Sequence, residues 1–299
     1  WRLLSAGTTG QTYNSLISNL WTQGFTGADE TGGASNVLTW TTNNATKDLS
    51  NWISISNQTE NLISGNGFAM YVFSDDNGPN ISGDSGFPKT ISVSGFQPSE
   101  NVSITINPNN SGWTLAGNPF NTTIDWDLIE KTNVNDAVYV YNTSTSSWIS
   151  WNGSVGSLTN GLIQRFQGFF IQSANSGTPS LVIPTSAQLG SGVFYGKTAA
   201  IKPFCFSLKL TADGLSDHLW FSFTEDGNIT LDHQDALKLT PLANKYVVLS
   251  SVLEDNTILD INNLPLLSEK TTIPLSFVTT FSNSFTISSA SKPVKLGIE

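Results

Sequence analysis

The sequence predicts an all-β fold, in which a duplicated antiparallel β-unit, sandwich-like or barrel-like, is followed by a C-terminal β-sandwich with very few short helices. Three observations lead to this prediction. Short alternating runs are separated by Gly, Asn, Asp and Pro, which favour turns. The order of these runs repeats along the chain. Ser, Thr and Asn make up 101 of the 299 residues, and Ser and Thr suit the solvated face of an antiparallel sheet.

Two runs show the alternation most clearly. Apolar residues occupy every second position in residues 102–106 and again in residues 204–210. A period of two is typical of a half-buried strand. Further strands are predicted at 67–74, 89–96, 137–142, 168–173, 219–224 and 272–278. Helical periodicity is confined to residues 13–21, with one or two more helical turns predicted at 125–131.

An internal repeat relates the first and second hundred residues. The matched segments are 1–4 with 113–116, 36–40 with 137–141, 52–54 with 148–150, and 67–70 with 168–171. The order is constant although the loop lengths differ. We therefore predict a duplicated β-unit with copies at about 1–88 and 101–198, and not a solenoid of short repeats. Large aromatic residues at matched positions are expected to be buried.

The composition changes near residue 198. Eight of the nine Trp precede that point, and a Gly-rich stretch at 190–196 leads up to it. We predict two domains, a duplicated β-domain at 1–198 and an immunoglobulin-like β-sandwich at 203–299. The second has about 100 residues, which is the size of one such sandwich.

Charge and composition limit the classes of partner. The net charge is −10 and only 12% of residues are charged, which argues against binding to nucleic acid. The chain has no apolar run of about 18 residues, so we expect no membrane span. One Cys excludes a disulfide scaffold. With no signal peptide at its start, the chain is expected to be part of a longer polypeptide.

One motif resembles a known family. The segment 113–120 (WTLAGNPF), followed by Ile124, Asp125 and Trp126, resembles a "GWNLVGNPYPSPIDW" pattern of large secreted surface proteins of Bacteroidetes and related bacteria. Residues 167–171 (QGFFI) are similar to the "GQGFFV" strand that follows it there, and residues 204–278 to a β-domain near the end of such proteins. The resemblance implies export by the type IX secretion route and display on the cell surface, and such families have no generally assigned activity.

Candidate catalytic residues are few. His218 and His233 each follow an Asp, but no Gly-x-Ser-x-Gly motif accompanies them. Asp125 and Asp127 flank Trp126 as a glycosidase pair could, but Asp125 also suits a helix N-cap. Cys205 lies in a strand-like run and is expected to be a packing residue. We therefore predict no catalytic residues and no enzyme activity.

Calcium is the metal that the oxygen-rich composition favours. Asp75, Asp76 and Asp84 form the candidate calcium site, and a second acidic cluster contains Asp226, Asp232 and Asp235. Neither has EF-hand spacing, and acidic turn residues also bond to their own backbone. No other cofactor is predicted.

The aromatic residues are the best candidates for binding a ligand. Trp148 and Trp151 fall on opposite faces of a regular strand, and Trp151 has no counterpart in the first copy. We predict Trp151 as an exposed, sugar-stacking residue, with Asn152, Tyr139 and Tyr141 completing the ligand site.

Together these features predict a non-enzymatic extracellular cell-surface protein for adhesion, glycan contact or surface assembly. Its partners would be glycans or other surface proteins. Two alternatives stay open, namely an accessory region of a larger secreted hydrolase and a structural subunit of a surface layer or filament.

Overall fold

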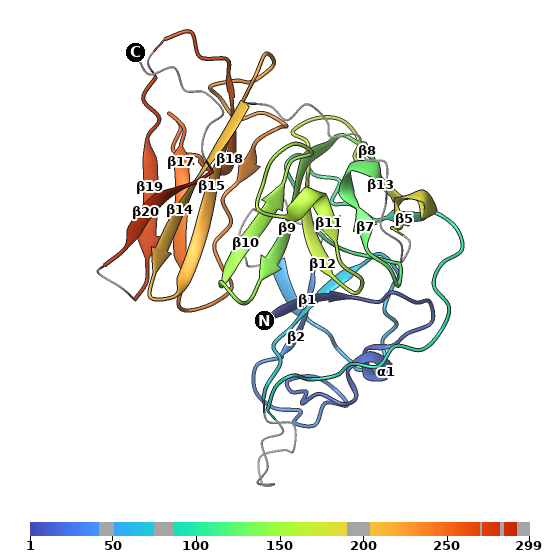
Figure 1. Ribbon diagram of the computed structural model, residues 1–299. Coiled ribbons are helices and arrows are strands. Elements are labelled where there is room, and N and C mark those ends of the chain that lie inside the picture. Colours follow the sequence, from blue (N-terminus) through green and yellow to red (C-terminus); the bar gives the residue numbers. More distant parts are fainter. Residues whose placement is uncertain (42–50, 75–85, 190–203, 270, 282–283, 292–299) are drawn as a thin grey trace. The chain divides into compact units, whose positions relative to one another are not determined.

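The computed structural model describes residues 1–41, 51–74, 86–189, 204–269, 271–281 and 284–291. It is almost entirely β-structure in antiparallel sheets (Figure 1), which confirms the predicted fold class. Among these residues the only α-helix is α1 (Tyr13–Ile17), capped by the Thr12 side chain, and it is shorter than predicted. The helical turns predicted at 125–131 reduce to one 3-10 turn, η2 (Trp126–Leu128), followed by a strand.

The chain folds into two compact units. The first unit contains Trp1–Val134 and Ile163–Val193, and the second contains Asn135–Leu162 and Phe194–Glu299. The sequence division at 1–198 and 203–299 differs from this grouping because it assigned residues 135–162 to the first domain. The predicted boundary at 198–203 itself lies outside the described residues.

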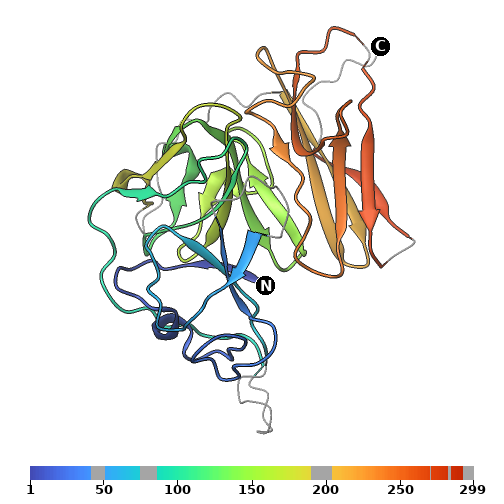
Figure 2. The ribbon, with the colours of Figure 1, turned by 180° about the vertical axis from the view of Figure 1, so that it is seen from behind.

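The first unit is built from short strands joined by long irregular connections, which Figure 2 shows around α1. One sheet has the order β1 (Arg2–Ser5), β4 (Gly67–Met70), β2 (Val37–Trp40), β3 (Trp52–Ser54). A second pairs β6 (Trp113–Gly117) with β12 (Gly168–Ser173). A third has the order β5 (Val102–Ile104), β13 (Ser180–Ile183), β8 (Glu130–Thr132). The remaining short elements of this unit are β7 (Ile124–Asp125) and η4 (Thr185–Ala187), whereas η3 (Thr159–Gly161) belongs to the second unit and β11 (Leu162–Ile163) crosses the division in the sequence.

The strand register confirms the repeat. In the antiparallel pair β1–β4, Leu4 lies opposite Phe68. In β6–β12, Ala116 lies opposite Phe169. These are the residues that the sequence repeat matches, so the first and the last of the matched strands pair in the same register in both copies.

The matched hairpins share a register as well. Trp40 of β2 lies opposite Trp52 of β3. In the second copy, Tyr141 of β9 (Val134–Asn142) lies opposite Trp148 of β10 (Ser147–Trp151). Both pairs bring aromatic rings into edge-to-face contact, with ring centroids 5.0 Å and 5.1 Å apart.

The two copies exchange equivalent hydrogen bonds within the first unit. The Ser5 amide donates to the Phe166 carbonyl at 3.0 Å, and the Gly117 amide donates to the Gly65 carbonyl at 2.8 Å. The repeat matches Ser5 with Gly117 and Gly65 with Phe166. Each contact therefore occurs twice with its partners exchanged, which is the signature of an approximate two-fold axis. Both carbonyl residues adopt positive φ, 88° at Gly65 and 60° at Phe166.

Two matched glycines make this exchange possible. A Cβ at Gly67 would lie 2.5 Å from the Ala116 carbonyl oxygen, and one at Gly168 would lie 2.9 Å from the Leu4 carbonyl oxygen. The backbones of the two copies thus approach at a distance that only glycine allows. The neighbouring Phe68 and Phe169 are both fully buried, as predicted for matched aromatics. Trp1 and Trp52 are less completely buried than these two residues.

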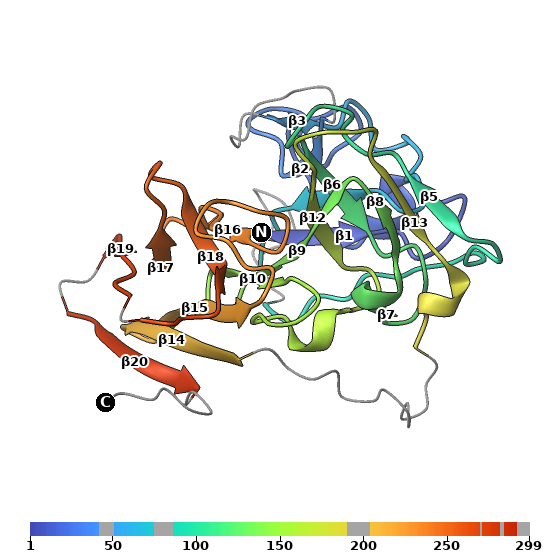
Figure 3. The same cartoon turned by 90° about the horizontal axis from the view of Figure 1, so that it is seen from above.

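The second unit contains the hairpin β9–β10 and a curled sheet. The sheet has the order β19 (Leu275–Thr279), β17 (Val247–Val252), β18 (Ile258–Pro265), β15 (Leu215–Thr224), β14 (Phe204–Ala212), β20 (Thr286–Ser291), with β16 (Ala236–Leu237) also paired to β18. All neighbours are antiparallel except β15 and β18. Strand β17 also packs against β14 and β15, which are not its hydrogen-bonded neighbours. The sheet therefore folds over on itself around an apolar core, as Figure 3 shows from above.

We predict that Gly67→Ala lowers the free energy of unfolding by about 1–3 kcal/mol, because the new methyl group overlaps a backbone carbonyl that cannot move independently. Urea unfolding followed by tryptophan fluorescence measures this loss. Gly32→Ala is the matched control, since its Cβ would meet only the end of the flexible Glu30 side chain. Equal losses in the two variants would contradict a specific close approach at Gly67.

Candidate functional site

The segment after β10 forms a tightly organised loop in the second unit. The Asn152 side-chain oxygen accepts hydrogen bonds from the Ser154 amide at 3.1 Å and the Val155 amide at 2.9 Å. Its side-chain amide donates to the Gln234 carbonyl at 2.6 Å. Gly156 has a φ of 147°, and a Cβ there would lie 2.1 Å from the Ser150 carbonyl oxygen. The loop conformation therefore depends on Asn152 and Gly156.

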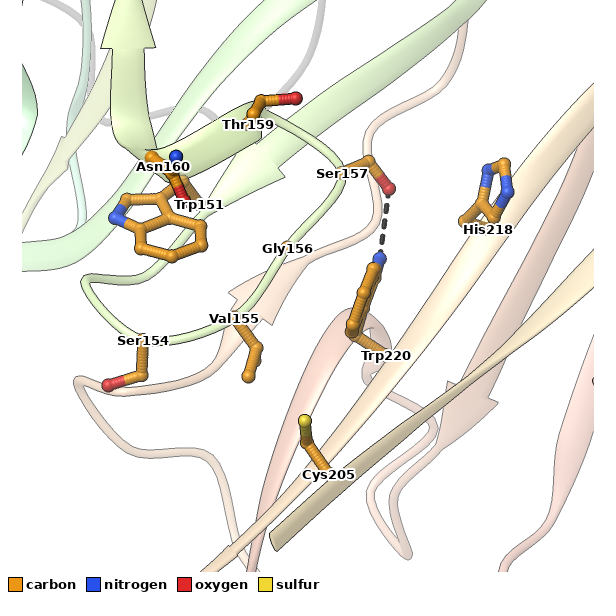
Figure 4. A pocket seen from close by; sticks show the side chains of 10 residues that line it. All are labelled: Trp151, Ser154, Val155, Gly156, Ser157, Thr159, Asn160, Cys205, His218 and Trp220. Atoms are coloured by element: carbon orange, nitrogen blue, oxygen red, sulfur yellow. Dashed lines mark hydrogen bonds between the residues drawn. The ribbon is translucent and has the colours of Figure 1, made fainter. Parts of the chain in front are cut away.

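The loop faces strand β15. The Trp220 indole N–H donates to the Ser157 hydroxyl at 3.0 Å, as Figure 4 shows. His218 lies two residues before Trp220 on the same strand, and residues two apart point to the same face of a sheet. Both side chains therefore face the loop.

A hollow of about 360 Å³ lies between the loop and β15. We call it the Trp220 hollow. It is lined by Trp151, Ser154, Val155, Gly156, Ser157, Thr159, Asn160, Cys205, His218 and Trp220. The indole rings of Trp151 and Trp220 contribute its aromatic surface, and the polar Ser154, Thr159 and Asn160 are exposed. The arrangement combines aromatic faces with hydroxyl and amide groups.

Among the described residues that line the Trp220 hollow, His218 and Cys205 carry titratable groups. Burial, and then the positive charge of Lys209, lower the pKa of His218. The imidazole is therefore neutral at neutral pH, when one ring nitrogen donates and the other accepts a hydrogen bond. The hollow thus offers neutral hydrogen-bonding groups.

The structure brings only one of the predicted ligand residues to the hollow. Trp151 lines it but is buried, with 8% of its surface exposed, so the prediction that its face is open to solvent is wrong. Trp148 on the opposite face of β10 is also buried, and its indole N–H donates to the Thr240 carbonyl at 2.9 Å. Both faces of β10 are covered, and strand alternation alone does not reveal that.

The other predicted ligand residues have structural roles. Asn152 is buried and holds the loop. The Tyr139 hydroxyl is buried and accepts a hydrogen bond from the Leu237 amide at 2.8 Å. Tyr141 is buried against Trp148. None of the three lines the Trp220 hollow.

The candidate acids and metal ligands are placed as follows. The buried Asp125 caps η2 by accepting a hydrogen bond from the Asp127 amide at 3.0 Å. The calcium candidates Asp75, Asp76 and Asp84 lie outside the described residues. Within the part of the chain that the structure describes, no three His, Cys, Asp or Glu side chains are grouped to hold a metal ion.

The second acidic cluster is partly structural. The Asp235 carboxylate is buried and accepts hydrogen bonds from the Asn263 amide at 2.8 Å and the Asp232 amide at 3.0 Å. It therefore joins the loop before β16 to strand β18.

The sequence analysis did not predict one feature of the second unit, a buried group of three charged side chains. The Lys238 ammonium lies 2.6 Å from an Asp217 oxygen and 2.5 Å from an Asp260 oxygen, and each side chain is only 3% exposed. Part of it was detectable, because Asp217 shares its strand face with the apolar Leu219 and Phe221. Alternation in β15 therefore predicts that Asp217 points inward.

Comparisons with known proteins do not assign the chain to a family. No protein-family model, curated protein or solved structure matches the chain. No helix in the described ranges is both long and apolar enough to cross a bilayer.

We predict that the Asp235 carboxyl makes the stability of the fold decrease as the pH rises. Burial raises the pKa of Asp235 from 3.8 to about 7. Between these values the folded chain holds a proton that the unfolded chain has lost. The free energy of unfolding therefore decreases with rising pH over this range, with a slope of up to about 1.4 kcal/mol per pH unit from this carboxyl. Burial also raises the pKa of Asp217, to about 6, which adds to the same trend.

Urea unfolding at a series of pH values measures this slope. Asp235→Asn removes the titrating group and should flatten the dependence. Asp213→Asn, at an exposed turn position, is the control for the loss of one carboxylate. A slope that is equally steep in the wild type and in Asp235→Asn would contradict the prediction.

Proposed function

We propose that the chain is a non-enzymatic extracellular or cell-surface protein that serves adhesion or surface assembly, and that it contacts glycans at the Trp220 hollow. The observation that carries this proposal is the combination of indole rings with exposed hydroxyl and amide groups around one hollow. The extracellular location and the type IX export route rest on the sequence resemblance.

Sugar recognition fits these groups physically. The C–H face of a pyranose packs against an indole ring, while its hydroxyls need donors and acceptors at the edge. Trp220 supplies a ring, and Ser154, Thr159 and Asn160 supply polar groups. A volume of about 360 Å³ is at the small end of the range for ligand sites. The hollow therefore suits one or two sugar residues of a longer glycan.

Binding is favoured over hydrolysis by the lining of the hollow. Glycoside hydrolysis uses two carboxyl groups on either side of the scissile bond. The described residues that line the Trp220 hollow include no Asp or Glu. The neutral imidazole of His218 is a hydrogen-bonding group there. A role as the accessory binding region of a larger secreted hydrolase uses the same contacts.

One observation favours the alternative of a subunit in a surface layer or filament. Strand β19 stands at one end of the described sheet order. Its Leu275, Phe277 and Val278 side chains are between 42% and 45% exposed. An edge strand with exposed apolar side chains is suited to strand addition by another chain.

We predict that Trp220→Ala weakens glycan binding by at least about tenfold, or about 1.4 kcal/mol, because it removes the stacking ring. An array of neutral oligosaccharides identifies a binding probe, and calorimetric titration with that oligosaccharide measures affinity. Ser154→Ala at the exposed rim should weaken binding with little effect on folding, since its side chain is exposed.

Trp21→Ala is the matched control, because Trp21 is a half-buried tryptophan in the first unit. Its affinity should equal that of the wild type. The glycan proposal fails if the wild type binds no oligosaccharide on the array, or if Trp21→Ala and Trp220→Ala weaken binding equally.

A further inference from the structure

The buried group around Lys238 has an unusual composition for the interior of a β-sheet protein. Asp217 lies on β15, Asp260 lies on β18, and Lys238 directly follows β16. The two carboxylates contact the same ammonium group at 2.6 Å and 2.5 Å. Burying three charges carries a large desolvation cost, which ion pairing repays only in part. A contribution to the stability of the fold therefore does not by itself explain this group.

The surrounding hydrogen bonds hold the three side chains in place. The Leu249 amide donates to an Asp217 oxygen at 2.8 Å. The Ser150 hydroxyl donates to the Asp260 oxygen that does not contact Lys238. The Lys238 ammonium also donates to the His218 carbonyl at 3.1 Å. The amine is thus directed at two carboxyl groups in a site from which bulk water is excluded.

We propose that Lys238 and Asp217 become joined by an intramolecular amide bond, with Asp260 as the proton carrier. The two residues lie on neighbouring segments of one unit, so the bond would be a covalent cross-link within the curled sheet. This inference does not depend on the proposed glycan site.

The reaction is a dehydration in which atoms and charges balance. One proton passes from the ammonium of Lys238 to the carboxylate of Asp217, which leaves an amine and a carboxylic acid. The amine nitrogen attacks the Asp217 carboxyl carbon to form the C–N bond. Asp260 takes the surplus proton from nitrogen and delivers it to the departing hydroxyl. The C–O bond breaks, one water molecule leaves, and Asp260 returns to its ionised form.

Three features of the site favour this step. The reacting groups are held in contact, which replaces an encounter in solution by a unimolecular reaction. The product removes two of the three buried charges. Burial raises the pKa of the Asp217 carboxyl to about 6, which makes its acid form accessible. Although burial alone would lower it, the two carboxylates raise the pKa of Lys238, so the ion pair is the starting state.

The mass of the intact full chain tests the proposal. The cross-linked protein should be lighter than its sequence mass by one water molecule. Trypsin should not cleave after Lys238, because the acylated side chain is no longer a substrate. The expected tryptic product covers residues 210–245 with one water missing, and its fragments should locate the link between Asp217 and Lys238.

Two variants complete the experiment. Lys238→Arg keeps a positive charge between the carboxylates but removes the nucleophilic amine, so its mass should equal its full sequence mass. Lys209→Arg, on β14, should still lack one water molecule. A wild-type chain with full mass and normal cleavage at Lys238 would overturn the proposal, and a link to Asp260 would overturn the assignment of Asp217 as the acceptor.

Discussion

In the first unit, the close approach of two backbones at matched glycines determines how the duplicated copies combine. Each copy contributes only short strands, and a sheet of short strands has little stability alone. Because Gly67 and Gly168 carry no Cβ, the carbonyls of Ala116 and Leu4 reach the opposite copy. This close approach accompanies the two exchanged hydrogen bonds, from the Ser5 amide to Phe166 and from the Gly117 amide to Gly65. Each copy thus provides hydrogen-bond partners for backbone groups of the other, so the two copies pack as one structure.

The second unit depends on polar contacts between distant segments. The hairpin β9–β10 and its loop are separated from the curled sheet by many residues of chain, yet they belong to the same compact unit. Buried hydrogen bonds join them, and the partners are Tyr139 with Leu237, Trp148 with Thr240, Ser150 with Asp260, and Asn152 with Gln234. A buried polar group without a partner is costly. These contacts therefore specify one position of the hairpin within its unit.

The sequence predicted the strands and their repeated order better than it predicted the binding residues. Alternation and the repeat are local patterns, and the matched Trp52 and Trp148 do occupy equivalent positions in their hairpins. The exposure of Trp151 depends on the loop that follows β10, and the role of Asn152 depends on Gln234, 82 residues away. Alternation indicates which face a residue occupies but not whether another segment covers that face. Trp220 went unrecognised as a ligand candidate for the same reason.

Strand β15 connects the two functional proposals through its alternation. His218 and Trp220 face the hollow, while Asp217, Leu219 and Phe221 are buried on the opposite face. A covalent link at Asp217 restrains the strand that presents the Trp220 ring, three residues further along. Restraining a binding surface before the ligand arrives lowers the entropy lost on binding. The cross-link would thus serve the hollow as a rigid support, although neither proposal requires the other.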